Sequence, residues 1–238
     1  MNTTQPQLKP GPGPKHKKES PLLNLMLNIL IPTIIMMKFS TSEYLGQVYG
    51  LIVALAFPLG YGIFDLIKSS KVNGFSLIGL FSILITGGIG LFELDKTWMI
   101  VKETAIPLIM GMVVVISEKT SKPLVKSFLG QMIDLDMIRD AYEEKQLGHL
   151  FKGRLKKSTY MLASTFVVSA ILNFVLAVYV LKGNPGTEEF IESLGKMTFL
   201  SFPVITVPTM LMVGFILYYL FNGIKKETDL EIEDVFRQ

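Results

Sequence analysis

Long uncharged runs of apolar residues, separated by short polar turns, constrain this chain more than any other feature of its sequence. In the clearest case, an uncharged run over 75–92 is followed by the turn Glu93–Thr97 and by a second apolar run over 98–117, which carries Lys102 and Glu103 near its start. Each run has about the 20 residues that an α-helix needs to cross a bilayer core about 30 Å thick. Because backbone groups in lipid must be satisfied within their own segment, the two runs predict an antiparallel pair of transmembrane helices.

The composition indicates the same class of protein. Half of the 238 residues are hydrophobic and the mean hydropathy is +0.45, which is typical of a polytopic helical membrane protein. The chain has no cysteine, which excludes disulfides, thiol catalysis and cysteine-based metal sites. The net charge of +3 is small and no basic face on a soluble module is present, so nucleic-acid binding is not expected.

Six apolar stretches predict an all-α fold of six transmembrane helices, arranged as three antiparallel hairpins. We expect these helices at residues 21–38, 44–68, 75–92, 98–117, 158–181 and 193–221. The first four would occupy 21–117 and the last two 158–221. Two tails remain: residues 1–20, which are basic, rich in Pro and Gly and expected to be disordered, and the charged residues 222–238. No signal-peptide cleavage site follows the first apolar run.

The distribution of positive charge predicts the orientation. Of the 23 Lys and Arg residues, 18 lie in the two tails, the 68–74 link and the 118–157 connection, all on one predicted side. The positive-inside rule then places both termini in the cytoplasm. For a bacterial protein this membrane would be the inner membrane.

The 118–157 connection is the one long polar segment, with nine Lys or Arg and six Asp or Glu. Apolar residues four apart, such as Ile133 and Met137, predict one or two amphipathic helices within 131–155, lying along the lipid headgroups. A basic cluster over 148–157 ends the segment, and we expect it to attract anionic lipid. His149 has no second His or Cys nearby, so a metal site is not expected.

Lys102 and Glu103 are the most informative charges in the predicted helices. They follow Trp98, a residue typical of the membrane interface, and lie about 6–8 Å further in. A charge at that depth is costly unless it is paired or in contact with water. The two residues therefore predict either local pairing or a polar cavity that opens on the outer side of the membrane.

Five further polar positions are candidates for the same cavity: Asn173, Lys196, Asn24, Asn28 and Asp65. Each also has a plainer interpretation. Asn24 and Asn28 are four apart and could form an interhelical hydrogen bond, and Asp65 could pair with Lys68 or Lys71.

Small residues predict close helix packing at two places. Gly46 and Gly50 form a GxxxG motif at the start of the second helix, and three glycines follow Thr86 near the end of the third. The glycines after Thr86 are a poor fit to a phosphate-binding loop, because no strand and no Gly-Lys-Ser/Thr ending accompanies them.

A series of short motifs carries a family resemblance from about residue 60 onward. In order these are Lys71-Val72, Gly87-Gly88, Lys102-x-Thr104, Lys122-Pro123-Leu124 with Gly130, Asn173 and Lys196. The sequence resembles the intracellular septation protein A family of bacterial inner-membrane proteins. Two motifs nearer the N-terminus, Asn24-x-x-x-Asn28-x-x-x-Pro32 and Phe57-Pro58-Leu59-Gly60-Tyr61-Gly62, are similar to a divergent branch of that superfamily. The resemblance implies a role in envelope synthesis, division or membrane homeostasis and supplies no catalytic residue. This chain departs from the family in its charged insertion over 134–155 and its longer basic N-terminal tail.

Three classes of function are open. The first is a non-enzymatic membrane protein that supports envelope biogenesis or division through contacts with proteins or lipids. The second is a small transporter or channel for an anionic solute or lipid, using the polar cavity. A membrane enzyme is not expected, because two distant His, no Cys and no HExxH-type set leave no catalytic cluster. No cofactor is expected; the lipid bilayer, envelope or division proteins and further copies of the chain are the candidate partners.

Overall fold

The computed structural model describes residues 21–69, 74–121 and 123–236, and the described secondary structure is helical throughout. The expectations for residues 1–20 and for Lys71 and Lys122 lie outside these ranges.

The first helix is continuous but alternates between α-helical and π-helical turns: α1 (Pro21–Leu25), η1 (Met26–Leu30), α2 (Ile31–Ile34) and η2 (Ile35–Phe39) follow one another without a break. The π-helical turns η1 and η2 flank Pro32, whose missing N–H removes one rung of the α-helical ladder.

The next three helices are α3 (Gly46–Ser69), α4 (Gly74–Leu91) and α5 (Thr97–Ser117). Their bounds agree with the predicted bounds within about two residues. The α4–α5 turn ends at Asp95, whose carboxylate accepts the Thr97 backbone N–H at 2.8 Å. Hydrogen bonds from Thr97 lower the pKa of the Asp95 carboxyl, so the carboxylate is charged and stabilises the start of α5 at neutral pH.

The second half of the chain is also helical. It contains α6 (Leu124–Met132), α7 (Leu135–Glu144), α8 (Gly148–Val180), α9 (Glu188–Ser201), η3 (Phe202–Thr206), α10 (Val207–Thr228) and α11 (Ile232–Val235). The helix α8 begins ten residues earlier than predicted, because no residue between 148 and 158 breaks it. The last long helix begins at Glu188 because the Thr187 hydroxyl accepts the Phe190 backbone N–H, with Glu188 and Glu189 in the first turn.

Within the described residues, four helical segments are long and apolar enough to cross a membrane: Gly46–Ile67, Thr97–Ser117, Gly148–Val180 and Glu188–Thr228. Two shorter apolar helices, Met26–Phe39 and Leu77–Leu91, accompany them. Large apolar side chains cover the outer surface, including Tyr179 at 78% and Leu211 at 72% exposure. Such a surface is stable in lipid and costly in water, so the fold is that of an integral membrane protein.

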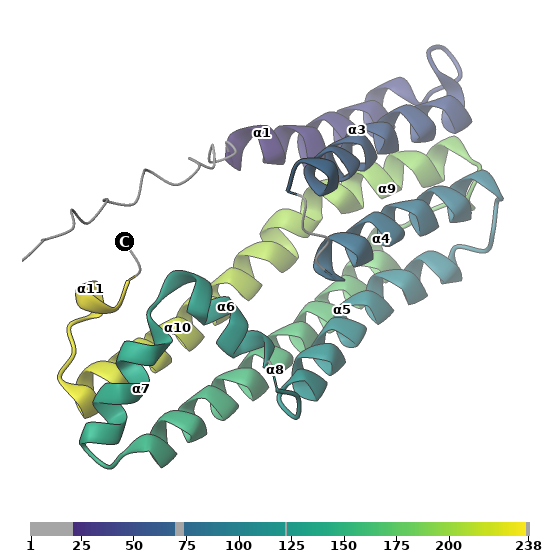
Figure 1. Cartoon of the computed structure of the whole chain (residues 1–238). Helices are drawn as coiled ribbons and strands as arrows, with labels where there is room; N and C mark the ends of the chain where they lie inside the picture. Colours follow the sequence, from purple (N-terminus) through teal and green to yellow (C-terminus); the bar gives the residue numbers. More distant parts are fainter. Residues whose placement is uncertain (1–20, 70–73, 122, 237–238) are drawn as a thin grey trace, which may run out of the picture.

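The helices run between two ends of the molecule (Figure 1). The turns at 40–45, 92–96 and 181–187 gather at one end, which we call the turn end, and α6, α7 and α11 lie at the other. The most extensive packing is between α5 and α8, followed by α8 with α10 and α3 with α4. Gly111 allows the α5 backbone to approach α8, because a Cβ there would lie 3.2 Å from the Phe166 Cβ.

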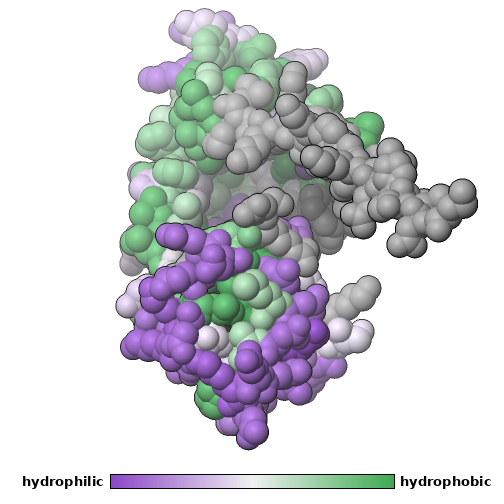
Figure 2. Space-filling model, turned by 60° about the vertical axis from the view of Figure 1, so that its left-hand side comes forward, coloured by the Kyte–Doolittle hydropathy of each residue, from purple (hydrophilic) through white to green (hydrophobic). Residues whose placement is uncertain are grey.

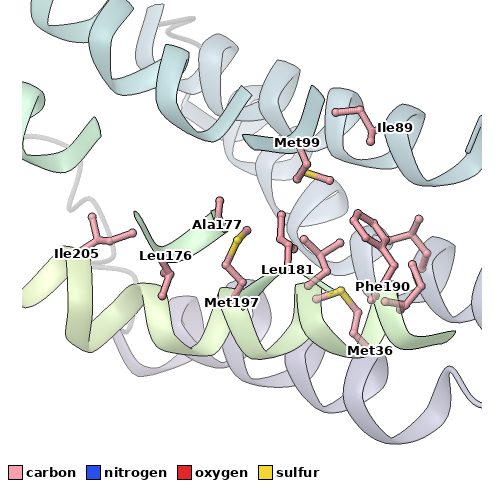
Figure 3. Close-up of a cluster of buried hydrophobic side chains, with 13 residues drawn as sticks. Met36, Ile89, Met99, Leu176, Ala177, Leu181, Phe190, Met197 and Ile205 are labelled. Atoms are coloured by element: carbon pink, nitrogen blue, oxygen red, sulfur yellow. The ribbon is translucent and has the colours of Figure 1, made fainter. Parts of the chain in front are cut away.

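An apolar core fills the interior toward the turn end (Figure 3). Its side chains come from η2, α3, α4, α5, α8, α9 and η3, and Met36, Met99, Phe190 and Ala177 are at most 3% exposed. Three of the core residues are methionines, whose flexible side chains fill the gaps between crossing helices. The core thus joins the N-terminal helices to the C-terminal pair.

The two small-residue motifs contribute to packing as predicted, although not all of their glycines do. A Cβ on Gly50 would lie 2.8 Å from the Ser40 Cα, so this glycine lets α3 pack against the end of the first helix. Gly46 instead has a positive φ of 69° and begins α3 in open space. Near the end of α4, a Cβ on Gly90 would lie 2.3 Å from the Leu51 Cδ2, which places α4 directly on α3.

A second apolar cluster builds a separate module at the end opposite the turns. We call this module the helical cap; it consists of α6, α7, α11 and the ends of α8 and α10, residues 148–157 and 219–228. Ile138 and Tyr142 of α7 are fully buried against Phe151, Leu220 and Ile224. The 118–157 connection contains two short amphipathic helices, but only α7 lies within the predicted range of 131–155: α6 begins at Leu124, and residues 148–157 are the start of α8. The apolar faces of α6 and α7 are covered by α8, α10 and α11 rather than left for the headgroups. Hydrophilic residues dominate the surface of this end (Figure 2).

Candidate functional site

The first candidate site lies between α4 and α5, where Lys102 is only 8% exposed. Its ammonium donates a hydrogen bond to the Thr86 hydroxyl at 2.7 Å and lies 2.5 Å from the Glu103 carboxylate. The Thr86 hydroxyl in turn donates to the Ser82 carbonyl at 3.0 Å. The local pairing predicted for Lys102 and Glu103 is therefore present, with Thr86 as a partner that the sequence did not indicate.

An apolar pocket of about 360 Å³ adjoins Lys102. Its walls come from α4, α5 and the turn between them, and they include Phe81, Ile85 and Trp98. Phe81 and Trp98 are 64% and 60% exposed, so the pocket lies on the outer surface of the helix pair. Lys102 is the one charged residue among the described residues that line this pocket, and Thr86 and Glu103 already satisfy its charge.

The two asparagines of the first helix form a different set of contacts. The Asn28 side-chain amide donates to the Asn24 carbonyl oxygen at 2.9 Å, and the Asn24 amide donates to the Tyr61 hydroxyl at 3.4 Å. Tyr61 belongs to α3, so this set is the interhelical hydrogen bond that the spacing predicted. Its role is to tie the first helix to α3.

Asn173 and Lys196 make local contacts within single helices. Asn173 donates to the Ser169 carbonyl one turn earlier, at 2.8 Å. Lys196 is half exposed and pairs with Glu192 at 2.6 Å. The sequence predicts Lys68 or Lys71 as the partner of Asp65. The structure does not describe the side chains of these two lysines, so this pairing stays a prediction. The hydrogen bonds and ion pairs of the described residues join Lys102 to Glu103 and Asn28 to Asn24, but they do not join these two pairs to each other or to the other candidates. A shared cavity therefore stays a prediction.

Sequence reasoning missed a second polar centre, which lies inside the helical cap. Arg154 of α8 donates two hydrogen bonds to the Glu227 carboxylate of α10, at 2.8 and 2.5 Å. The Tyr142 hydroxyl of α7 donates to the same carboxylate at 2.7 Å. Burial, together with this hydrogen bond to a charged acceptor, raises the pKa of Tyr142 above its usual range, so Tyr142 is a neutral donor at every physiological pH.

Small and aromatic residues hold Arg154 in place. Its guanidinium lies directly on Gly223, where an added Cβ would lie 2.0 Å from the guanidinium carbon. The same guanidinium lies 5.2 Å from the centre of the Tyr219 ring, and the Lys157 ammonium lies 4.9 Å from it. Arg154 and Glu227 are 73 residues apart, so no local pattern in the sequence could have paired them. We call Arg154, Glu227 and Tyr142 the cap triad.

Neither centre has the composition of a metal site. No group of three or more His, Asp or Glu side chains that could hold a metal ion occurs within residues 21–69, 74–121 and 123–236. The cap triad contains one carboxylate, and its oxygens already accept three hydrogen bonds from Arg154 and Tyr142. Its geometry is that of a structural connection between three helices.

The apolar helices and the cap thus define a polytopic helical membrane protein. The family model for intracellular septation protein A matches residues 23–141, which is half of the chain, and the chain belongs to that family. No curated protein and no solved structure matches the chain. The match begins nearer the N-terminus than the short motifs indicated, and it ends in α7, before Asn173 and Lys196.

Proposed function

We propose that this septation-family protein crosses the bacterial inner membrane six times, as three helical hairpins with both termini in the cytoplasm, and acts there without catalysing a reaction. In this arrangement the turn end faces outward and the helical cap projects into the cytoplasm. The excess of Lys and Arg at the cap end supports the orientation. The cap would then connect the membrane domain to proteins of envelope synthesis or division.

The observation that carries this proposal is the outer face of α7. On the inner face of α7, Ile138 and Tyr142 are buried, while the side chains of Asp136, Arg139 and Asp140 on the outer face are at least half exposed. Arg139 lies within 4.0 Å of carboxylates on Asp136, Asp140 and Glu143, so the charged side chains form one connected surface. Such exposed ion pairs contribute little to stability, and their accumulation on a packed helix suits contact with a partner.

Neutralising this face tests the proposal. In a variant with Asp136→Asn, Asp140→Asn and Glu143→Gln, we expect the full-length protein to insert normally and to lose co-purification with division or elongation proteins. The matched control neutralises three exposed carboxylates near the turn end, at Glu43, Glu188 and Glu189, and should keep the contact. Equal yields of these partner proteins from both variants would contradict the proposal.

A second candidate function is supported by one observation, the burial of Lys102 within an apolar helix. A buried lysine in a membrane segment is a frequent feature of solute pathways, and its charge favours an anionic solute or lipid. If the protein is a transporter or channel for such a ligand, Lys102→Ala should change the flux of anions into liposomes that contain the protein. Flux that is unchanged from the wild type would leave Lys102 as a purely structural residue.

A further inference from the structure

The basic cluster at the start of α8 divides into two faces with different environments. Arg154 and Lys157 point toward α10, where they contact Glu227 and Tyr219. Lys152 and Lys156 are four residues apart and lie on another face, where they line a pocket of about 350 Å³ together with Lys126 of α6. All three lysines are exposed, and none pairs with an acidic residue in the described part of the chain. The start of α8 therefore carries Arg154 and Lys157, which have partners on α10, on one face and exposed lysines without an acidic partner among the described residues on another.

The basic pocket contains one negative charge. Glu118 also lines it, and its carboxylate accepts a hydrogen bond from the Thr159 hydroxyl at 3.0 Å. Three lysines against one carboxylate leave a net positive charge of two at this place. The pocket therefore suits an anion with several oxygen atoms, such as a phosphate group.

An apolar pocket of about 280 Å³ lies next to the basic one. Neighbouring residues of the same two helices surround the two pockets: Leu124 and Ser158 lie at the apolar pocket, while Pro123 and Thr159 lie at the basic one. Further in, Leu162 and Phe166 of α8 and Val213 of α10 continue the apolar lining along the membrane-spanning parts of these helices. A ligand with an anionic head and an apolar chain would contact both pockets.

Ser158 lies behind the apolar side chains that line this pocket. The residue is fully buried, and its hydroxyl has no hydrogen-bond partner among the described residues. Because Ser158 has no accessible surface, a ligand in the apolar pocket would contact the apolar side chains around it and not its hydroxyl.

From these features we propose that the protein binds one anionic phospholipid of the surrounding bilayer, with the phosphate on Lys126, Lys152 and Lys156 and an acyl chain between α5, α8 and α10. The lipid joins α6, and with it the helical cap, to the membrane domain. This inference rests on the proposed function in one respect, that α8 and α10 cross the membrane and the cap lies where they leave it. It does not depend on which side of the membrane the cap occupies.

Native mass spectrometry of the purified full-length protein tests this site, with phosphatidylglycerol and phosphatidylcholine of equal chain length as competing probes. The wild type should retain phosphatidylglycerol in preference. In the variant Lys126→Gln, Lys152→Gln, Lys156→Gln, the preference should fall on the order of tenfold, because each lysine near an anionic headgroup contributes to its binding. The matched control, Lys38→Gln, Lys96→Gln, Lys182→Gln, changes the same net charge near the turn end and should keep the wild-type preference.

A second variant tests the apolar pocket separately. Val213→Phe places a larger side chain in the pocket without touching the lysines, so it should reduce retention of both lipids while the preference for phosphatidylglycerol persists. Inorganic phosphate should not displace the bound lipid, because it cannot occupy the apolar pocket. Three results would overturn the proposal: equal preference in the two lysine variants, undiminished retention in Val213→Phe, or displacement by inorganic phosphate. These measurements use purified protein and lipid, so they are independent of the partner-protein test above.

Discussion

Replacing Glu227 with leucine should destabilise the helical cap by about 3–5 kcal/mol, because it leaves the Arg154 charge half-buried and without its carboxylate. The Arg154 and Glu227 side chains are each 20% exposed, so water can replace only part of the lost contact. The Tyr142 hydroxyl loses its acceptor at the same time. Hydrogen exchange of the α7 backbone amides, measured in detergent, should show this loss as faster exchange confined to the cap.

Two further variants show whether charge or packing causes the effect. The double variant Arg154→Met, Glu227→Leu removes both charges and should regain most of the protection, since an apolar pair of similar volume is often as stable as a buried ion pair. The control Glu231→Leu breaks the exposed ion pair with Lys225 and should change exchange little. Equal effects of Glu227→Leu and Glu231→Leu would mean that the cap triad has no special role.

The variant Glu103→Leu should have a comparable effect in the membrane domain, again about 3–5 kcal/mol, because it removes the one carboxylate among the described residues that pairs with the buried Lys102. The Thr86 hydroxyl remains as a hydrogen-bond acceptor, but it carries no charge to oppose that of the ammonium. The free energy of unfolding in mixed micelles of mild detergent and dodecyl sulfate measures this loss.

The compensating variant for this site is Lys102→Met, Glu103→Leu, which removes both charges and should restore most of the stability. Glu192→Leu is the matched control, since it breaks the half-exposed pair with Lys196 and should cost little. A Glu103→Leu protein as stable as the wild type would mean that Lys102 reaches water, which would favour the solute-pathway alternative.

Helix positions could be predicted from this sequence because lipid leaves few alternatives. A run of about 20 apolar residues has to satisfy its own backbone, and the ends of α4 and α5 follow directly from the charged turn at 93–97. The early start of α8 was missed because its basic residues suggested a surface helix. The helix continues through them, since Arg154 and Lys157 have partners on α10.

The polar contacts were harder to predict than the helices. Asn24 and Asn28 could be paired by their spacing of one helical turn, and Lys102 with Glu103 by adjacency. The link from Arg154 to Glu227 spans 73 residues and depends on how α8 packs against α10, which helical periodicity does not determine. The position of Gly223 beneath Arg154 follows from the same packing and has no separate signal in the sequence.

The central claim, six crossings with the cap in the cytoplasm, is tested most directly by labelling single cysteines in intact cells with a membrane-impermeant thiol reagent. The chain has no native cysteine, so each introduced thiol reports one position. We expect labelling at Glu43→Cys, Asp95→Cys and Lys182→Cys in the three turns, and at Glu144→Cys and Glu233→Cys in the cap only after the cells are permeabilised. Labelling of either cap position in intact cells, or protection of any one of the three turns, would contradict the account.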